Sequence, residues 1–256
     1  MRDLFDFAFF PNLDDTIETL AELAQHEDWE NEKKQTQPKP ILRNYLNYTF
    51  RRLQEENKVI KLEDKACFNT GLATNNQEEI FAYFVPHNQN KKKWFFKSFS
   101  KESDYYLTSF NKLPEVASYF QKSSDLVYDI SLDEPRVDYD HIINKQKNRE
   151  RFPKPFDSMT DYQLQNAIIA GIKQAMKRVK RNYKTAIPQY FWDKNAAEGE
   201  LQLLLPLCLS NPSKADVALA VKRTNNVYSV ETILTLDMAY NNARLLARPD
   251  REWLQP

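Results

Sequence analysis

Positively charged side chains recur at helical spacing between Thr160 and Tyr190, and these are the residues best placed to bind a polyanion. On a helix with about 100° per residue they share one sector, because each member is three or four positions from another member. The members of this set are Lys173, Lys177, Lys180, Arg181 and Lys184. The spacing predicts a cationic stripe that binds phosphates; the alternative is an ordinary solvated lysine face on a core helix.

The same stretch has a second, apolar sector, wide enough to pack on a protein core. It consists of Ile168, Ile169, Ile172, Ala175, Met176 and Val179. Thr160 and Gln163 predict a capping box at the start of the helix, and Pro188 limits how far it can run. We therefore expect one face to anchor the helix while the other exposes its charges.

A second basic segment precedes this helix, between Asp138 and Phe156, and it contains two prolines. Its cations are Lys145, Lys147, Arg149, Arg151 and Lys154. We expect an exposed connection here, and local charge density of this kind favours a phosphate-binding surface.

The sequence contains no nucleotide-binding or metal-binding motif that would identify a reaction. With only three glycines, neither a dinucleotide-binding turn nor a phosphate loop can be written. The three histidines are far apart and lack a second ligand at metal spacing. Cys67 and Cys208 lie in apolar runs, which predicts buried free thiols and a reducing cytoplasm. No cofactor is evident, although a divalent cation remains compatible with the acidic residues.

Composition restricts the class of protein. The 256 residues are 41% apolar and 13% aromatic, enough to fold. Lys plus Arg and Asp plus Glu both total 36, so any affinity for nucleic acid must come from local segregation of charge. No run approaches the roughly 20 apolar residues of a membrane span, and the N-terminus lacks a cleavable-signal pattern. We expect a cytoplasmic protein without membrane contact; its oligomeric state is not indicated.

Periodicity predicts an N-terminal helical lobe, residues 1–57, before an α+β core, residues 58–256, continuous with the lobe in one domain. Two helices are expected in the lobe, Asp14 to Ala24 and Ile41 to Glu56. A first strand block follows at 59–62, 66–72, 79–85 and 91–99, with a hairpin turn at Asn88 and Asn90. In its last strand, alternation places Trp94 and Phe96 on one face and Phe95, Lys97 and Phe99 on the other. The second face is either a platform for stacking bases or part of a strand buried on both sides.

The rest of the chain predicts further short elements. A helix is expected from Leu113 to Phe120, and a strand from Leu126 to Ile130. A second strand block is expected at 201–209, 215–223 and 227–236, followed by a helix at 237–247. The Asn225–Asn226 turn is too short for a crossover, so the last two strands must be antiparallel. Together these elements predict an α+β fold with mixed or mainly antiparallel sheets and packed helices.

Six spaced phrases together suggest a family. They are FNTGL at Phe68 to Leu72 followed by EEIFAYF, then NYKTAIPQYF, LQLLLPLCL, ADVALAV and TILTLDMAYNNARLLARPDREWL. The combination resembles the OST-HTH (LOTUS) associated domain of bacteria and phages, over about Leu20 to Leu254. The resemblance implies RNA binding or processing, although no OST-HTH module accompanies it here. The polar positions that it matches are Asn69, Thr70, Asn182, Tyr183, Lys184, Gln189, Asp216, Thr235, Asp237, Tyr240, Asn241 and Arg244.

Three functions follow as hypotheses. In the first, the cationic stripe and Arg244 hold RNA phosphates, and Tyr183, Tyr190 or Trp94 stack on unpaired bases. A polar pocket beside the stripe would comprise Asn69, Thr70, Gln189, Asp216, Asp237, Tyr240 and Asn241. The alternative interpretation of Asn69 and Thr70 is a local turn, and that of Arg244 an ion pair.

The second hypothesis is an RNA- or nucleotide-modifying enzyme. In it Asp216, Glu231 and Asp237 hold a divalent cation, and Lys184 or Arg244 stabilises phosphoryl charge. The third is an assembly factor that uses the apolar N-terminal helices. The sequence does not decide whether the protein is an enzyme.

Overall fold

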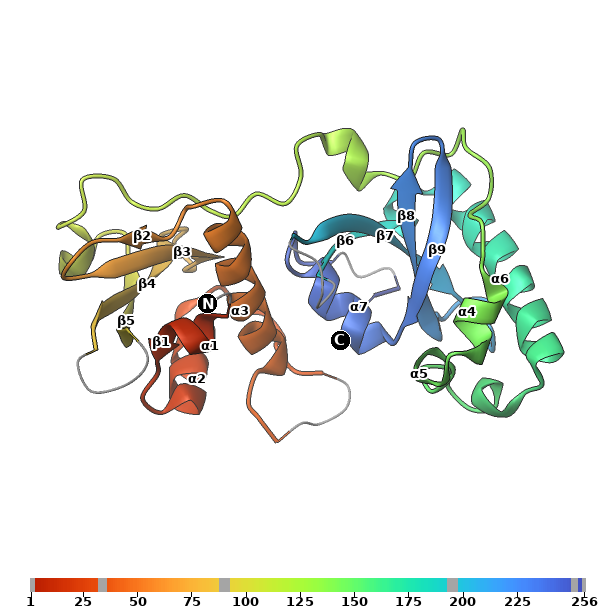
Figure 1. Cartoon of the computed structure of the whole chain (residues 1–256), viewed down its shortest axis with the longest axis horizontal. Helices are drawn as coiled ribbons and strands as arrows, with labels where there is room; N and C mark the ends of the chain where they lie inside the picture. Colours follow the sequence, from red (N-terminus) through yellow and green to blue (C-terminus); the bar gives the residue numbers. More distant parts are fainter. Residues whose placement is uncertain (1–2, 32–35, 88–92, 193–197, 250–252, 255–256) are drawn as a thin grey trace. The chain divides into compact units, whose positions relative to one another are not determined.

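The computed structural model describes residues 3–31, 36–87, 93–192, 198–249 and 253–254. The chain forms two compact units, Met1–Ser118 and Tyr119–Pro256. Each unit contains one mostly antiparallel sheet with packed helices, which confirms the predicted α+β fold (Figure 1). None of the helices in the described ranges combines the length and apolar character needed to cross a membrane.

The first unit contains a five-stranded sheet in the order β1-β5-β4-β3-β2. β1 is parallel to β5, and the other neighbours are antiparallel. Its elements are α1 (Leu4–Phe7), β1 (Ala8–Phe9), α2 (Leu13–Leu23), α3 (Pro40–Glu55), β2 (Ile60–Lys61), β3 (Ala66–Ala73), β4 (Glu79–Pro86), β5 (Trp94–Lys101) and the 3₁₀ turn η1 (Tyr105–Leu107).

Aromatic side chains join the N-terminal helices to this sheet. Phe50 of α3 lies 5.2 Å from Phe68 of β3, centroid to centroid, and Phe68 lies 5.8 Å from Phe84 of β4. Ile17 of α2 and Leu46 of α3 are fully buried. The apolar sides of these helices are therefore used inside the first unit. The compact units divide between Ser118 and Tyr119, so the N-terminal helices and the first sheet belong to the same unit.

Of the two alternatives for β5, the aromatic platform is not favoured, because Phe95, Lys97 and Phe99 do not share one face. Tyr83 pairs with Ser98 and Phe84 with Phe96, so the register shifts at Lys97. The extra residue turns Phe99 back toward Phe96, and the two rings lie 4.7 Å apart. The predicted turn at Asn88 and Asn90, with Lys91 and Lys92, lies outside the described residues.

The helix predicted from Leu113 to Phe120 is also wrong, since this segment has no regular secondary structure. Instead, side chains from the last turn of α3 and from just after α3 donate hydrogen bonds to the backbone carbonyls of the 113–120 segment. Arg52 donates from Nε to the Ser118 carbonyl at 2.7 Å, and Lys58 donates to the Val116 carbonyl at 2.9 Å. Nor does a strand form at Leu126 to Ile130: the 3₁₀ turn η2 (Ser123–Leu126) ends at Leu126, and the residues after it have no regular secondary structure.

The second unit contains a four-stranded antiparallel sheet in the order β6-β7-β8-β9. The predicted hairpin is confirmed: Thr224 pairs with Val227, and Asn225 has a φ of 56°. The elements are α4 (Tyr139–Asn144), α5 (Gln146–Arg149), η3 (Phe156–Ser158), α6 (Asp161–Arg181), η4 (Tyr183–Thr185), β6 (Ile187–Phe191), β7 (Glu200–Leu207), β8 (Val217–Thr224), β9 (Val227–Leu234) and α7 (Leu236–Ala243).

The structure corrects the expected ends of two helices. Pro188 does not end a helix, because α6 already stops at Arg181; it lies in β6, an edge strand, where proline is tolerated. The last helix is shorter than predicted and ends at Ala243. Its cap is Thr235, whose hydroxyl accepts the Met238 N–H at 3.3 Å.

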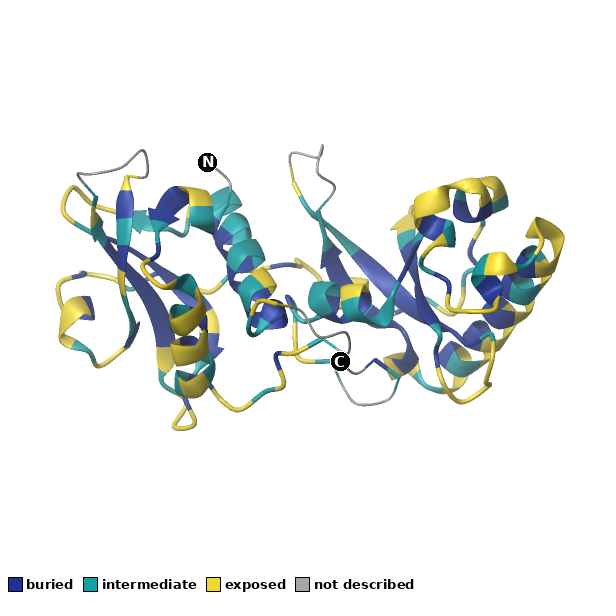
Figure 2. Ribbon diagram, turned by 90° about the horizontal axis from the view of Figure 1, so that it is seen from below, coloured by how far each residue is buried: buried dark blue, intermediate teal, exposed yellow. Residues whose placement is uncertain are grey.

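Helices α6 and α7 cover opposite faces of the second sheet (Figure 1). On the α6 side, Ile168 and Ile172 share a buried cluster with Leu203, Leu205 and Val221. In Figure 2 the strands of both sheets are largely buried, and the helices carry exposed residues along one side. The sheet therefore holds α6 rigidly, with its outer side facing solvent.

Candidate nucleic-acid interface

Helix α6 begins and packs as its sequence predicts. The capping box forms: Thr160 Oγ1 accepts the Gln163 N–H at 3.3 Å, and the Thr160 N–H donates to Gln163 Oε1 at 3.1 Å. The buried side is formed by Leu164, Ile168, Gly171, Ile172, Ala175, Met176 and Val179. Gly171, not Ile169, belongs to the fully buried set, because the helix lies very close to β7 there.

Four of the predicted cations, Lys173, Lys177, Lys180 and Arg181, lie on α6, whereas Lys184 lies beyond the helix end in η4. All five side chains are exposed, and together they are called the α6 cationic face. In the described part of the chain, Lys173, Lys177 and Lys180 have no carboxylate within ion-pair distance. Arg181 donates from Nε to the Lys177 carbonyl at 3.1 Å. The last-turn cations also stabilise the negative end of the helix dipole. The charge is nevertheless turned toward solvent, where a polyanion can reach it.

An exposed tyrosine follows the cationic face. Tyr183 lies in η4 and is 61% exposed. Asn182 holds this turn, since its side-chain oxygen accepts the Lys184 N–H at 3.1 Å. The other two aromatic candidates are buried: Trp94 is 2% exposed and Tyr190 is 4% exposed. Of the three, Tyr183 alone is available for stacking on a base.

The preceding basic segment is not the exposed connection that its composition predicts. Arg149 donates to the Asp157 carbonyl and pairs with Asp161, both at 3.0 Å. Arg151 donates to Thr232 Oγ1 at 2.8 Å, and burial lowers the pKa of its guanidinium. Phe152 is buried in the core of the second unit. Two of the five cations therefore fix the loop, and the exposed ones are Lys145, Lys147 and Lys154.

Asn69 and Thr70 have structural partners in the first unit. The Asn69 carbonyl oxygen accepts the Gly71 N–H at 2.9 Å, and its amide donates to Glu79 at 3.0 Å. Thr70 donates to the Ile80 carbonyl at 2.6 Å. Gly71 has a φ of 73°, a conformation that favours glycine, at a bulge in β3. The local-turn interpretation thus describes these two buried residues.

The remaining members of the predicted polar pocket lie in the second unit. Asp216 closes the β7–β8 connection by accepting the Leu209 and Ser210 N–H groups at 2.6 and 2.9 Å. Gln189 and Tyr240 are buried. Asn241 donates to the Asp237 carbonyl within α7 at 2.8 Å. These contacts hold the fold together, and the set is divided between two compact units.

The predicted carboxylate cluster does not form. No group of three His, Cys, Asp or Glu residues in the described ranges is arranged to hold a metal ion. Glu231 instead accepts from Ser229 Oγ at 2.8 Å. Asp216, Glu231 and Asp237 are therefore not a cation site, which removes the reason for a metal-dependent reaction at these residues.

The two cysteines are buried and free, as predicted. Burial raises the pKa of Cys67 to about 12. Burial also raises the pKa of Cys208, opposed by Arg178, which donates to its sulfur at 3.3 Å. Thiolate is scarce at both positions at neutral pH, so neither is a candidate nucleophile.

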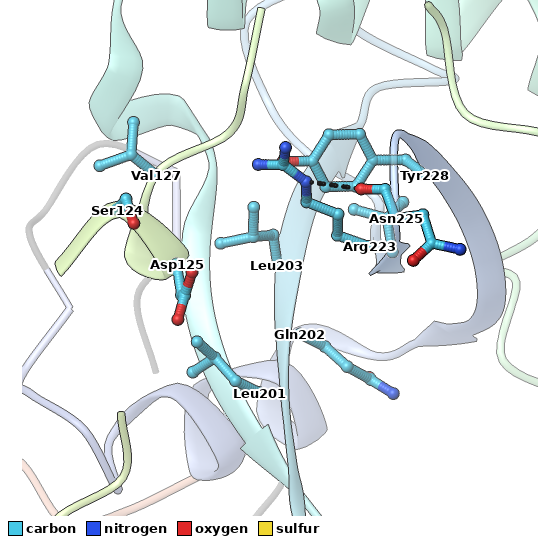
Figure 3. Close-up of a pocket in the computed structure, with 10 residues that line it drawn as sticks. Ser124, Asp125, Val127, Leu201, Gln202, Leu203, Arg223, Asn225 and Tyr228 are labelled. Atoms are coloured by element: carbon cyan, nitrogen blue, oxygen red, sulfur yellow. Dashed lines mark hydrogen bonds between the residues drawn. The ribbon is translucent and has the colours of Figure 1, made fainter. Parts of the chain in front are cut away.

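The second unit contains a cavity of about 340 Å³ that is not evident from the sequence. It is lined by Ser124, Asp125, Val127, Leu201, Gln202, Leu203, Val221, Arg223, Asn225 and Tyr228 (Figure 3). These residues come from η2, the segment after it, β7 and the β8–β9 hairpin. Because the segments are distant in sequence, no local motif could have identified the cavity.

Comparison with known proteins identifies a different family from the one that the six phrases suggest. No curated protein and no solved structure matches the chain. The resemblance to the OST-HTH associated domain is wrong, because the family model that matches is a different one. The RNA-related role implied by that resemblance loses its support, and the charge geometry must be judged by itself. The chain belongs to the family described as "Domain of unknown function (DUF3825)", whose model matches residues 20–253.

Proposed function

We propose that the second unit binds single-stranded RNA through the α6 cationic face. The observation that carries this proposal is the placement of four exposed cations on one side of α6, whose other side is buried in the core, with exposed Lys184 following in η4. The chain has no net charge, so this concentration is local. From Lys173 to Arg181 the helix rises by about 12 Å, enough to contact successive phosphates.

Tyr183 favours an unpaired strand over a duplex. Its exposed ring lies between Arg181 and Lys184 in the sequence, and base stacking on an aromatic ring requires a base that is not paired and stacked within a duplex. Phosphate contacts and stacking tolerate every base, so this surface by itself provides affinity with little sequence preference. Two free cysteines agree with action in a reducing cytoplasm.

The test is fluorescence anisotropy of a labelled single-stranded RNA over a salt series. We expect the variant Lys173→Gln, Lys177→Gln, Lys180→Gln, Lys184→Gln to bind at least about tenfold more weakly. Its salt slope should fall by about 0.7 for each phosphate that the variant no longer neutralises. Tyr183→Ala should cost about 1–3 kcal/mol with single strands and little with duplex RNA. Binding should persist in a chelator.

A matched control changes four other lysines that are exposed in the second unit: Lys122→Gln, Lys145→Gln, Lys147→Gln and Lys154→Gln. The total charge falls equally, so an effect of net charge alone would weaken both variants alike. The proposal requires the control to bind as the unmodified protein does. Equal affinity and salt slope in the α6 variant would mean that the cations are only a solvated face. Single-stranded DNA of the same sequence shows whether the ribose contributes.

A further inference from the structure

The cavity of the second unit has an apolar floor. Leu203, Val221 and Tyr228 form this floor, and all three belong to the buried core behind α6. Leu201 and Val127 continue the apolar lining toward the surface. At about 340 Å³ the space lies at the lower end of the range for small-ligand pockets, suited to one base rather than to a longer ligand.

Polar groups of opposite character flank the floor. Figure 3 shows Ser124 and Asp125 of η2 on one side of Leu203, with Arg223 and Asn225 of the β8–β9 hairpin on the other. The Asp125 carboxylate has no hydrogen bond or ion pair with any residue in the described ranges. It is a free acceptor at the mouth of the cavity.

Arg223 is held in place. Its Nε donates to the Asn225 carbonyl at 3.0 Å, and its Nη2 pairs with Asp129 at 3.1 Å. A guanidinium has five N–H groups, so donors remain for a ligand. A guanidinium fixed by two partners loses little entropy when it binds. The side chain of Gln202 is directed elsewhere, toward Gln189 and Glu200.

This arrangement determines which ligand fits the cavity. The ligand must have flat apolar faces for Leu203 and Val221, N–H donors for Asp125 and acceptors for Arg223. A phosphate or simple carboxylate fits poorly, because Asp125 repels it and the floor offers it no partner. Guanine fits: its N1–H and N2–H₂ are adjacent donors, and its O6 and N7 are the acceptors that arginine binds in pairs. Adenine lacks the adjacent donor pair, and cytosine and uracil have no N7.

We propose that this cavity accepts one unpaired guanine base of the bound RNA. The inference rests on the proposed function, because the α6 cationic face would hold the strand from which the base is extruded. The two sites have separate tasks, affinity on the helix and base selection in the cavity.

The test uses nucleosides with the full chain, since a nucleoside carries no phosphate for the lysines to bind. Guanosine, adenosine, cytidine and uridine are titrated and followed by NMR chemical shifts. Guanosine should shift the signals of Val127, Arg223 and Asn225, and the other three should bind at least about tenfold more weakly. Asp125→Asn should remove this preference. Val127→Trp should block the cavity at its mouth, and both positions are exposed, so the fold is retained.

Controls are Asp133→Asn and Ile130→Trp, exposed neighbours that do not line the cavity, and both should bind guanosine normally. Equal binding of all four nucleosides, or an unchanged preference in Asp125→Asn, overturns the assignment of guanine. If the α6 variant loses RNA binding but guanosine shifts no NMR signals of the full chain, the cavity proposal is overturned and the proposed function stands. If the protein binds guanosine but no RNA, the proposed RNA-binding function and the link between the cavity and RNA are both overturned.

Discussion

Gln189 lies at the centre of a chain of hydrogen bonds that joins two strands and a helix. Its amide donates to the Gln202 carbonyl oxygen at 2.8 Å, and its own carbonyl oxygen accepts from Asn242 at 3.0 Å. Gln202 then donates to Glu200 at 2.6 Å. A primary amide is suited to this place because it can donate and accept at once. A residue that the sequence suggested for a ligand pocket thus connects β6, β7 and α7.

Replacing Gln189 with leucine should lower the free energy of unfolding by about 1–3 kcal/mol, because the Gln202 oxygen and the Asn242 amide would be left without partners. RNA affinity should not change. Denaturant unfolding and anisotropy measure the two quantities. Gln174→Leu, at an exposed position of α6, is the control and should stay within about 0.5 kcal/mol. A Gln189→Leu variant of normal stability without RNA affinity would instead place this residue in a binding site.

The polar residues show the limit of interpreting single positions. The four exposed cations of α6 were predictable, since helical periodicity alone decides which side faces the core, whereas Lys184 lies past the helix end in η4. Asn69 and Asp216 were not, because their partners, Glu79 and the Leu209 and Ser210 amides, depend on strand pairing and on the path of a connection. The identity of a short polar residue in the sequence does not reveal whether its side chain binds a ligand or closes a turn.

At the scale of elements, α6 and β7 approach closely at Gly171. A Cβ built on this glycine would lie 2.7 Å from Leu207 Cδ1 and 3.3 Å from Leu209 Cδ2. Glycine inside a helix costs about 1 kcal/mol relative to alanine. Here it allows the helix to lie deep against the sheet, and this contact fixes the orientation of the cationic face.

Gly171→Val should therefore destabilise the protein by about 1–3 kcal/mol, because the larger side chain forces α6 away from a fully buried leucine. Ala170→Val is the matched control: it introduces the same β-branched residue on the exposed side and should cost at most about 0.7 kcal/mol of helix propensity. Thermal and denaturant unfolding of both variants give the comparison. Equal destabilisation of the two would show that the close approach is unimportant.

Elements with a strong period were predictable, and those defined by tertiary partners were not. Helices α3 and α6 and the β8–β9 hairpin carry clear apolar patterns or turn residues. The chain around Pro114 has the pattern of a helix start, yet Arg52 and Lys58 bind its carbonyls and keep it irregular. β6 was missed because its proline suggested a stop, whereas an edge strand accommodates it.

At the scale of the whole molecule, the family match and the compact units have different boundaries. The match runs from residue 20 to 253 and so includes most of both units, while each unit has its own sheet and its own core. This division was not predictable from composition, since no flexible linker sequence marks residues 118 and 119. It follows from the packing of the N-terminal helices on the first sheet.

The second unit should fold and bind RNA by itself. A chain of residues 119–256 keeps the buried cluster between α6 and the second sheet, the α6 cationic face and all residues of the cavity. It also keeps Tyr119, whose ring lies 5.0 Å from Tyr190, while the contacts of Arg52 and Lys58 remain in the first unit. We expect a cooperative thermal transition, and the same RNA affinity and salt slope as the full chain.

Residues 1–118 produced separately serve as the control and should fold without binding RNA. Circular dichroism melts and anisotropy on both halves and the full chain supply the data. A folded second half with weak affinity would show that the first unit contributes to the RNA site. A second half that fails to fold would show that the two compact units form one cooperative structure, and the binding experiments would then require the full chain.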